Sequence, residues 1–243
     1  MRRLILFDID GTLLTTNGAA RRAFHRALLE VYGTAGPIAT HAFDGKTDPL
    51  IARELLRAAG LADAAIDRGF EALWPTYLRN LAVELARPDH TTSVFPGVVE
   101  LLDALAERED KVVVGLLTGN IEQGAVLKLE SAGLGGRFPF GAYGSDHEQR
   151  DRLPAVAVER ARAATGREFR GREIVIIGDT PNDVTCGRAL GVQSVAVATG
   201  RHDPDTLAAA GADVVFEDFS DLDRVLDALL GDARQVVGSG LPA

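Results

Sequence analysis

Two aspartates close the first apolar run of the chain. Residues 4–7 read Leu-Ile-Leu-Phe, which is typical of a buried strand, and Asp8 and Asp10 follow this run with one residue between them. Side chains alternate along extended backbone, so both carboxylates start on the same side, at the carboxyl end of the strand. Because neighbouring carboxylates repel each other and are costly to desolvate, the pair indicates a metal site or an acid/base site.

Two later strand ends carry the same kind of side chain. Residues 117–120 read Leu-Thr-Gly-Asn and residues 178–183 read Gly-Asp-Thr-Pro-Asn-Asp, and each segment follows an apolar run. If the three strand ends gather at one edge of a sheet, four carboxylates and the Thr118 hydroxyl meet beside a helix start. Hard oxygen ligands suit Mg²⁺, which binds through one or two carboxylates, waters and a substrate phosphate. We therefore predict a site for Mg²⁺ and phosphate.

These residue types can carry out phosphoryl transfer. We expect Asp8 to attack phosphorus and form an aspartyl-phosphate, which divides one difficult displacement into two easier ones. Asp10 can protonate the leaving oxygen and then take a proton from the water that hydrolyses the intermediate. Thr118 and the amides after it can hold the non-bridging oxygens. The residues predicted to bind phosphate are Gly11, Thr118, Gly119 and Asn120.

An alternation of helix and strand patterns positions these strand ends. After the first strand and a long connection, strands are predicted over residues 111–117, 138–143, 173–177, 194–198 and 214–216. Helices are predicted over residues 98–107, 123–132, 153–165, 181–190, 204–210 and 222–230. This alternation predicts an α/β fold, a Rossmann-like, doubly wound and mostly parallel sheet with helices on both faces. Ligands of such sheets bind beyond the carboxyl ends of the strands, where the strand order reverses.

The connection after the first strand has helical periodicity and no evident strand. Helices are predicted over residues 19–32, over a segment that Pro49 opens and that runs to residue 59, and over residues 63–85 with an interruption at Pro75. We interpret residues 15–90 as an inserted all-helical cap over the end of the first strand. Residues 1–14 and 91–230 then form the catalytic core, and residues 231–243 are predicted to be a flexible tail.

Composition excludes several classes of protein. The chain has 243 residues with 26 basic and 35 acidic ones, and the net charge of −9 argues against a general nucleic-acid binder. A single cysteine excludes an internal disulfide framework and a multi-thiolate metal site. No apolar run is long enough to span a membrane, and we see no secretory signal, so we expect a cytoplasmic protein. The expected partner is a small phosphorylated metabolite, with no nucleic acid and no membrane, and the chain is expected to be a monomer or a homodimer.

Three segments, in this order, carry a resemblance to a known family. They are residues 8–13 (Asp-Ile-Asp-Gly-Thr-Leu), residues 116–120 (Leu-Leu-Thr-Gly-Asn) and residues 178–183. The chain resembles the haloacid dehalogenase superfamily, specifically its phosphoglycolate-phosphatase-like hydrolases with a helical cap of the C1 type after the first strand. The resemblance spans about residues 4–220. It implies Mg²⁺ held by the Asp8 carboxylate, the Asp10 backbone carbonyl and Asp179, with Asp183 as a ligand or just behind the ligands.

The chain departs from the family at one position. Family members usually supply a lysine before a helix start that contains proline, but residues 145–154 contain none. We expect an arginine to replace it, Arg150 first and Arg152 second. Arginine stays charged and can contact two oxygens, but it reaches differently from lysine.

Other readings of the same residues stay open. Thr118 and the Asp179–Thr180 pair can each act only as helix caps. Lys46 and Asp48 are candidate substrate contacts from the cap, although Asp48 also suits a helix N-cap, as does Thr47.

The sequence therefore predicts a Mg²⁺-dependent phosphatase that hydrolyses a small, phosphoglycolate-like phosphomonoester. One alternative is a sugar phosphomutase of the same superfamily, which would also need Asp8 and Asp10. A second alternative is a non-catalytic phospho-acceptor module similar to a response-regulator receiver. The large cap and the acid/base Asp10 count against the receiver.

Overall fold

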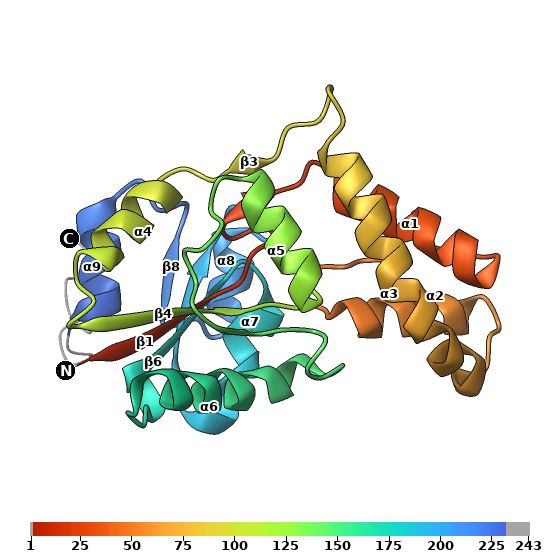
Figure 1. The fold of residues 1–243 in the computed structure, drawn as a ribbon. Helices are drawn as coiled ribbons and strands as arrows, with labels where there is room; N and C mark the ends of the chain where they lie inside the picture. The colour runs from red at the N-terminus through yellow and green to blue at the C-terminus, as the bar shows by residue number, and fades with distance from the viewer. Residues whose placement is uncertain (1, 232–243) are drawn as a thin grey trace.

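The computed structural model describes residues 2–231. They contain a six-stranded sheet with the order β5-β4-β1-β6-β7-β8, in which each pairing is parallel. The strands are β1 (Arg3–Phe7), β4 (Val112–Leu117), β5 (Gly141–Ala142), β6 (Ile174–Gly178), β7 (Gln193–Val197) and β8 (Val214–Phe216). Helices lie on both faces of the sheet (Figure 1), which confirms the predicted doubly wound α/β fold.

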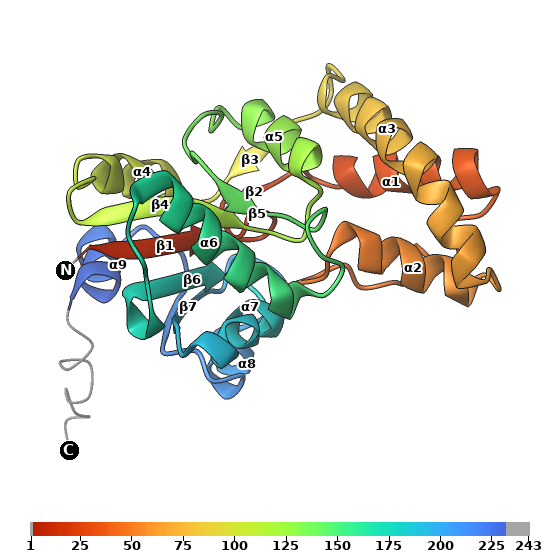
Figure 2. The same ribbon diagram turned by 60° about the horizontal axis from the view of Figure 1, so that its bottom comes forward.

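The strand order reverses at β1. The chain places β4 and β5 on one side of β1, then returns and places β6, β7 and β8 on the other side (Figure 2). Where the order reverses, the adjoining connections leave in opposite directions and open a crevice beyond the carboxyl ends of the strands. Asp8 and Asp10 follow β1 directly, so the topology places them at this crevice.

Alternation along β1 divides the core between the two faces of the sheet. Ile5 and Phe7 belong to one apolar cluster, and Leu4 and Leu6 belong to another. The first cluster includes residues of α4 (Val98–Ala106), α5 (Glu122–Ser131) and α9 (Leu222–Leu230). The second includes residues of α6 (Leu153–Thr165) and α7 (Pro181–Cys186), and α8 (Pro204–Ala209) packs beside α7. Because both faces are covered, the strands are buried and read as continuous apolar runs.

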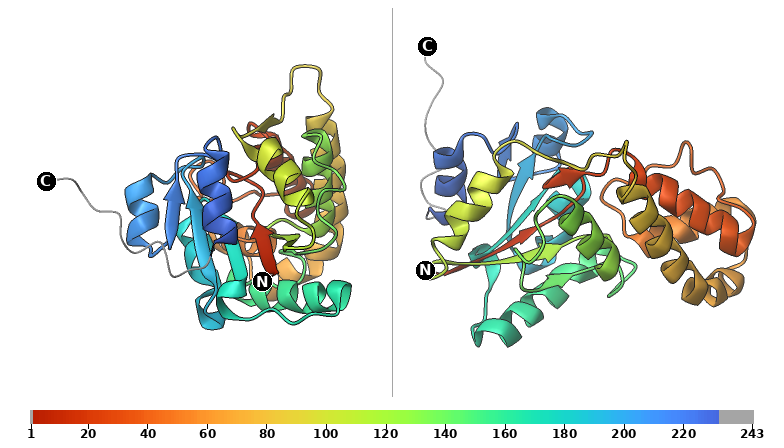
Figure 3. Two further views of the ribbon diagram at one scale, coloured as in Figure 1. Left: turned by 90° about the vertical axis from the view of Figure 1, so that its left-hand side faces the viewer. Right: turned by 45° about the horizontal axis from the view of Figure 1, so that its top comes forward.

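The three helices between β2 (Leu14–Thr15) and β3 (Ser93–Val94) have a core of their own. They are α1 (Ala19–Tyr32), α2 (Asp48–Ala58) and α3 (Asp63–Leu85), and they stand at one end of the sheet (Figure 3). The predicted interruption at Pro75 is wrong, because α3 continues through it. Proline removes the hydrogen bond to the carbonyl four residues earlier and crowds that carbonyl, but both Pro75 and Glu71 are exposed, so the carbonyl can turn outward and be satisfied by water.

Several short elements differ from the sequence prediction. β2 (Leu14–Thr15) and β3 (Ser93–Val94) pair antiparallel on either side of the helical insert, and two residues are too few to show a period. Of the strand predicted over 138–143, only β5 is observed, because Pro139 has no N–H to donate to a neighbouring strand. The helix predicted over 181–190 ends at Cys186. Single 3₁₀ turns occupy Arg150–Arg152, Gly171–Glu173 and Arg188–Leu190.

Residues 43–48, which we call the crossing segment, join the helical insert to the sheet edge. The Asp48 amide donates to the carbonyl of Gly119 at 2.7 Å, and the Asn182 side-chain amide donates to the carbonyl of Gly45 at 3.2 Å. A Cβ added to Gly119 would overlap with the backbone of Lys46. Glycine at position 119 therefore lets the two backbones approach this closely.

Two expectations concern the chain as a whole. Apart from Gly231, the predicted tail lies outside the described residues. Within residues 2–231, no helix combines the length and the apolar character needed to cross a membrane.

We predict that Gly119→Ala lowers the free energy of unfolding by about 1–3 kcal/mol, because the added methyl group must push the crossing segment off the sheet edge. Urea denaturation measures the change. Gly124→Ala is the matched control, since that glycine lies inside α5 with its nearest neighbour 3.3 Å from an added Cβ. Helix propensity makes the control neutral or stabilising. Equal losses in the two variants would contradict the close-packing explanation.

Candidate active site

A cavity of about 560 Å³ lies at the carboxyl end of β1. The sheet edge contributes Asp8, Asp10 and Thr118 to its wall, and the helical insert contributes Arg21 and Phe43. The cavity is therefore enclosed by parts of the chain that are far apart in sequence. Its size suits a small ligand.

Three buried carboxylates meet at the inner end of the cavity. Asp8 follows β1, Asp179 follows β6, and Asp183 lies in the first turn of α7. One oxygen from each lies within 4.8 Å of the other two. Burial, together with Asp183, raises the pKa of Asp8 to about 6 and that of Asp179 to about 9. The cluster thus has more negative charge than its surroundings neutralise.

Arg150 is the protein's own cation at this cluster. Its Nη2 lies 3.1 Å from the Asp8 Oδ1, contacts the Asp183 carboxylate and donates to the carbonyl of Leu117 at 3.3 Å. Burial by itself lowers the pKa of Arg150, but Asp183 and Asp8 outweigh burial and raise it. The structure thus brings Arg150 to Asp8, whereas the Arg152 side chain is exposed and does not line the cavity.

The donor set fits a divalent cation. Thr12 donates to the Asp179 Oδ1 at 3.2 Å, which leaves the second oxygen of Asp179 without a hydrogen bond from the described residues. Both oxygens of Asp183 are engaged, one with Arg150 and the other with Thr180. Asp8 and Asp179 therefore have oxygens to spare for a cation, and Asp183 holds Arg150 in place. Thr180, rather than Asp179, is the N-cap of α7.

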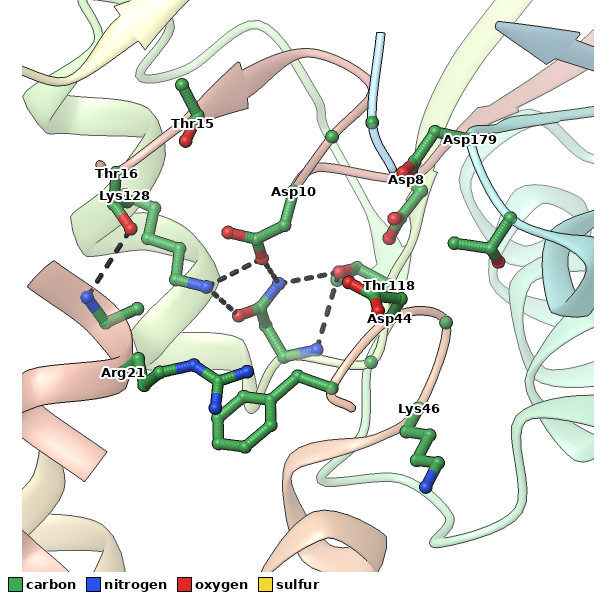
Figure 4. A pocket seen from close by; sticks show the side chains of 18 of the residues that line it. Asp8, Asp10, Thr15, Thr16, Arg21, Asp44, Lys46, Thr118, Lys128 and Asp179 are labelled. Atoms are coloured by element: carbon green, nitrogen blue, oxygen red, sulfur yellow. Dashed lines mark hydrogen bonds and ion pairs between the residues drawn. The ribbon is translucent and has the colours of Figure 1, made fainter. Parts of the chain in front are cut away.

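Asp10 belongs to a second, separate cluster in the same cavity. Its carboxylate points away from Asp179 and toward Lys128 (Figure 4). The Lys128 Nζ donates to the Asp10 Oδ2 at 2.6 Å and also to the Asn120 side-chain oxygen. Asn120 Nδ2 donates to the same Asp10 oxygen at 2.8 Å. The two aspartates of the first strand thus have different cationic partners.

Sequence reasoning missed Lys128. Its side chain is 4% exposed and comes from α5, 118 residues after Asp10. The signal was present in the helix pattern, because Lys128 falls on the same face as the buried residues Ala125 and Leu129. A lysine inside an apolar stripe is rarely buried without a partner.

The residues predicted to bind phosphate line the cavity. Thr118 is fully buried, and its Oγ1 accepts from Asn120 Nδ2 at 2.8 Å. Thr118 does not cap α5, whose N-cap is Ile121. Gly11 has φ +83°, and a Cβ there would overlap with the Asp179 carboxylate. Both the backbone conformation and the close carboxylate therefore require glycine at position 11.

The two candidate cap contacts are held by other residues. Lys46 Nζ pairs with Glu54 at 2.6 Å, and its side chain points away from the aspartates (Figure 4). The N-cap hypothesis for Asp48 is wrong, because Thr47 caps α2. Instead, the Ile121 amide donates to the Asp48 carboxylate at 2.9 Å, which ties α2 to the start of α5. Burial raises the pKa of Asp48 to about 6.

The cavity offers three chemical features. Arg150 holds the Asp8 carboxylate, Lys128 holds the Asp10 carboxylate, and the oxygens of the aspartate triad suit a cation. A group that binds between them meets a nucleophile candidate and a proton donor candidate on different walls.

Comparisons with known proteins find relatives of this chain in sequence and in fold. A family model described as haloacid dehalogenase-like hydrolase matches residues 5–197. A phosphoglycolate phosphatase of Rhodospirillum rubrum is 30% identical over 227 residues, 91% of this chain and 90% of that protein. A hydrolase from Pseudomonas syringae aligns at TM-score 0.68 and 24% identity, over 94% of this chain and 99% of that chain. CbbY from Rhodobacter sphaeroides in complex with phosphate aligns at TM-score 0.66 and 19% identity, over 91% and 96%. The two structures share the fold.

We predict that metal-free protein loses stability as pH rises from about 4 toward about 9, and that a divalent cation reverses the loss. The pKa values of Asp8 and Asp179 are raised to about 6 and about 9, so folding favours the protonated carboxylates, and ionising them costs stability. A cation that binds the ionised forms raises the melting temperature more at pH 8 than at pH 5. Thermal unfolding with chelator, Mg²⁺ or Mn²⁺ measures this.

Asp179→Asn serves as the test variant and Asp223→Asn, on the exposed face of α9, as its control. The first should lose most of the pH-dependent response to the cation, and the second should keep it. A cation response that survives in Asp179→Asn would place the cation elsewhere.

Proposed function

This chain belongs to the haloacid dehalogenase-like hydrolase family and is a phosphatase, and we propose that it hydrolyses a small phosphomonoester with Mg²⁺ through a phosphorylated Asp8. The observation that carries the proposal is the position of Asp8, buried at the inner end of the cavity between Arg150 and Asp179. A carboxylate held in this way has one oxygen fixed by the guanidinium and the other available to phosphorus.

The first step transfers the phosphoryl group to the protein. An Asp8 oxygen attacks phosphorus, the bond from phosphorus to the leaving oxygen breaks, and Asp10 gives its proton to that oxygen. Arg150, together with Thr118 and the amides of Gly119 and Asn120, balances charge on the non-bridging oxygens. Arg150 thereby takes the place of the lysine that the family usually supplies, and Arg152 has no part.

The second step hydrolyses the aspartyl-phosphate. Asp10, now ionised, takes a proton from a water molecule whose oxygen attacks the same phosphorus, and the bond to Asp8 breaks to release inorganic phosphate. Lys128 and Asn120 hold the Asp10 carboxylate in one orientation for both steps. Lys128 therefore acts through Asp10, as a positioning residue.

Mg²⁺ would be held by the Asp8 carboxylate, the Asp10 carbonyl and Asp179, and it would supply positive charge for the phosphoryl oxygens. The unneutralised charge of the triad supports this assignment.

The helical insert, residues 15–90, would serve as the cap over the core formed by residues 1–14 and 91–230. Through the crossing segment it lies against the sheet edge and narrows access of water to Asp8. The expected cytoplasmic location and the choice between monomer and homodimer stay predictions.

Relatives named phosphoglycolate phosphatases make 2-phosphoglycolate the first substrate to test. The cavity of about 560 Å³ is consistent with a metabolite of that size.

We predict that Asp8→Asn abolishes phosphate release from every member of a panel of phosphorylated metabolites, because an amide oxygen is a poor nucleophile. Release of inorganic phosphate with and without Mg²⁺ is the measurement, and the exposed Asp223→Asn is the matched control. Hydrolysis that survives in Asp8→Asn rules out the nucleophile. Conversion of a sugar phosphate into its isomer without release of phosphate would identify a phosphomutase instead.

We predict that Lys128→Met lowers kcat by about tenfold to about a hundredfold with little change in KM, since Asp10 loses the cation that orients it. Lys46→Met is the comparison, because Lys46 also lines the cavity but pairs with Glu54. Steady-state kinetics of the two variants decides the point. A larger loss of kcat in Lys46→Met would shift the role from the Asp10 cluster to the crossing segment.

A further inference from the structure

Five cationic side chains line the cavity, and four of them are paired with carboxylates. Arg150 pairs with Asp8, Lys128 with Asp10, Lys46 with Glu54, and Arg201 with Asp44 at 3.1 Å. The fifth is Arg21, which has no carboxylate within 4.0 Å among residues 2–231. After these internal pairings, one positive charge in the cavity is left without a partner of opposite sign.

The guanidinium of Arg21 is held in place by uncharged groups. Its Nη1 donates to the carbonyl of Ile38 at 2.6 Å, its Nη2 donates to the carbonyl of His41 at 3.1 Å, and its Cζ lies 4.0 Å from the centre of the Phe43 ring. Arginine has five N–H donors, and these two bonds leave three of them free. The side chain is thus oriented in advance and keeps donors for a ligand.

Arg21 is a partly buried cation. Burial lowers the pKa of Arg21, and only the more distant Asp44, itself paired with Arg201, opposes that effect. Arginine does not release its proton in proteins, so the guanidinium stays charged. An anionic ligand would provide the missing partner.

The start of α1 adds positive potential at the same wall. Gly18 is its N-cap and has no side chain to accept hydrogen bonds, and the first turn has no acidic residue. Gly18, Ala20 and Arg21 all line the cavity. The partial positive charge of a helix N-terminus favours a negative group beside it.

We propose that Arg21 is a specificity-determining residue that binds a carboxylate carried on the leaving group of the substrate. This inference rests on the proposed phosphatase function and adds the residue that would recognise the acidic group of the substrate. A carboxylate is favoured over a second phosphate because one unpaired guanidinium balances one negative charge, and Asp10, Asp44 and Asp48 line the same cavity. A planar guanidinium also matches a carboxylate through two parallel hydrogen bonds.

The test compares substrates that differ only in the acidic group. 2-Phosphoglycolate carries the carboxylate, 2-hydroxyethyl phosphate has a neutral hydroxymethyl group in its place, and ethane-1,2-diol bisphosphate carries a second phosphate. We expect Arg21→Gln to lower kcat/KM for 2-phosphoglycolate by about tenfold to about a hundredfold, mainly through KM. For 2-hydroxyethyl phosphate the loss should stay below about threefold.

Two further variants separate recognition from structure. Arg21→Lys keeps the charge but loses the planar fork of donors, so it should retain part of the preference for the carboxylate. Arg22→Gln removes a neighbouring cation of α1 that is already paired with Glu84 and should change both substrates by the same factor. Thermal unfolding monitored by circular dichroism checks that each variant is folded.

The outcomes are distinct. Equal losses on both substrates in Arg21→Gln would overturn the inference and make Arg21 only a support of residues 38–43. An Arg21-dependent preference for the bisphosphate would overturn the carboxylate assignment. If the wild-type chain releases phosphate from other panel members but from none of these three, the inference is overturned. If it releases phosphate from neither, the proposed function fails, and titration calorimetry with 2-phosphoglycolate then decides the inference by itself. An Arg21-dependent Kd supports carboxylate binding, and a Kd that Arg21→Gln leaves unchanged rejects it.

Discussion

The repulsion between buried carboxylates is the constraint on which the rest of this structure depends. Asp8, Asp179 and Asp183 bring oxygens within 4.8 Å of one another, in surroundings where burial raises the pKa of Asp8 and of Asp179. Arg150 compensates part of this charge, and a divalent cation would compensate the rest. The fold tolerates the cluster because parallel strands end at one edge and because Thr12, Thr180 and Arg150 donate to its oxygens.

The cavity separates two kinds of chemistry by giving each aspartate its own cation. Asp8 faces Arg150 and the triad, whereas Asp10 faces Lys128 and Asn120. Asp8 must be ionised to attack phosphorus, and Arg150 favours its ionised form, whereas Asp10 must be held in a fixed orientation, which Lys128 and Asn120 provide. The two aspartates lie just after β1, and the backbone turns at Gly11.

The helical insert contributes through contacts that its own sequence hardly reveals. The crossing segment meets the sheet edge through backbone groups of Asp48, Gly119 and Gly45, and the Thr47 side chain donates to the carbonyl of Glu148. Asp48 ties α2 to the amide at the start of α5, which lies next to Thr118 and Asn120. Any movement of the insert is therefore coupled to the predicted phosphate-binding residues. The insert also brings Arg21 to a wall of the cavity that faces the aspartates.

Local patterns in the sequence determined the α/β fold, the helical insert and the strand ends that carry Asp8, Asp10, Thr118 and Asp179, because periodicity and strand-terminal polarity act over a few residues. The resemblance to the family restricted the replacement of the missing lysine to Arg150 first and Arg152 second. Only the tertiary structure showed that Arg150 turns inward, that Lys128 meets Asp10 across 118 residues, and that Asp48 bonds to Ile121 rather than capping its own helix. The lack of a carboxylate partner for Arg21 among residues 2–231 was also visible only in the tertiary structure, because the partner of a charge depends on which segments fold against it. Short-range patterns specify where a side chain starts, and packing of distant segments decides what it touches.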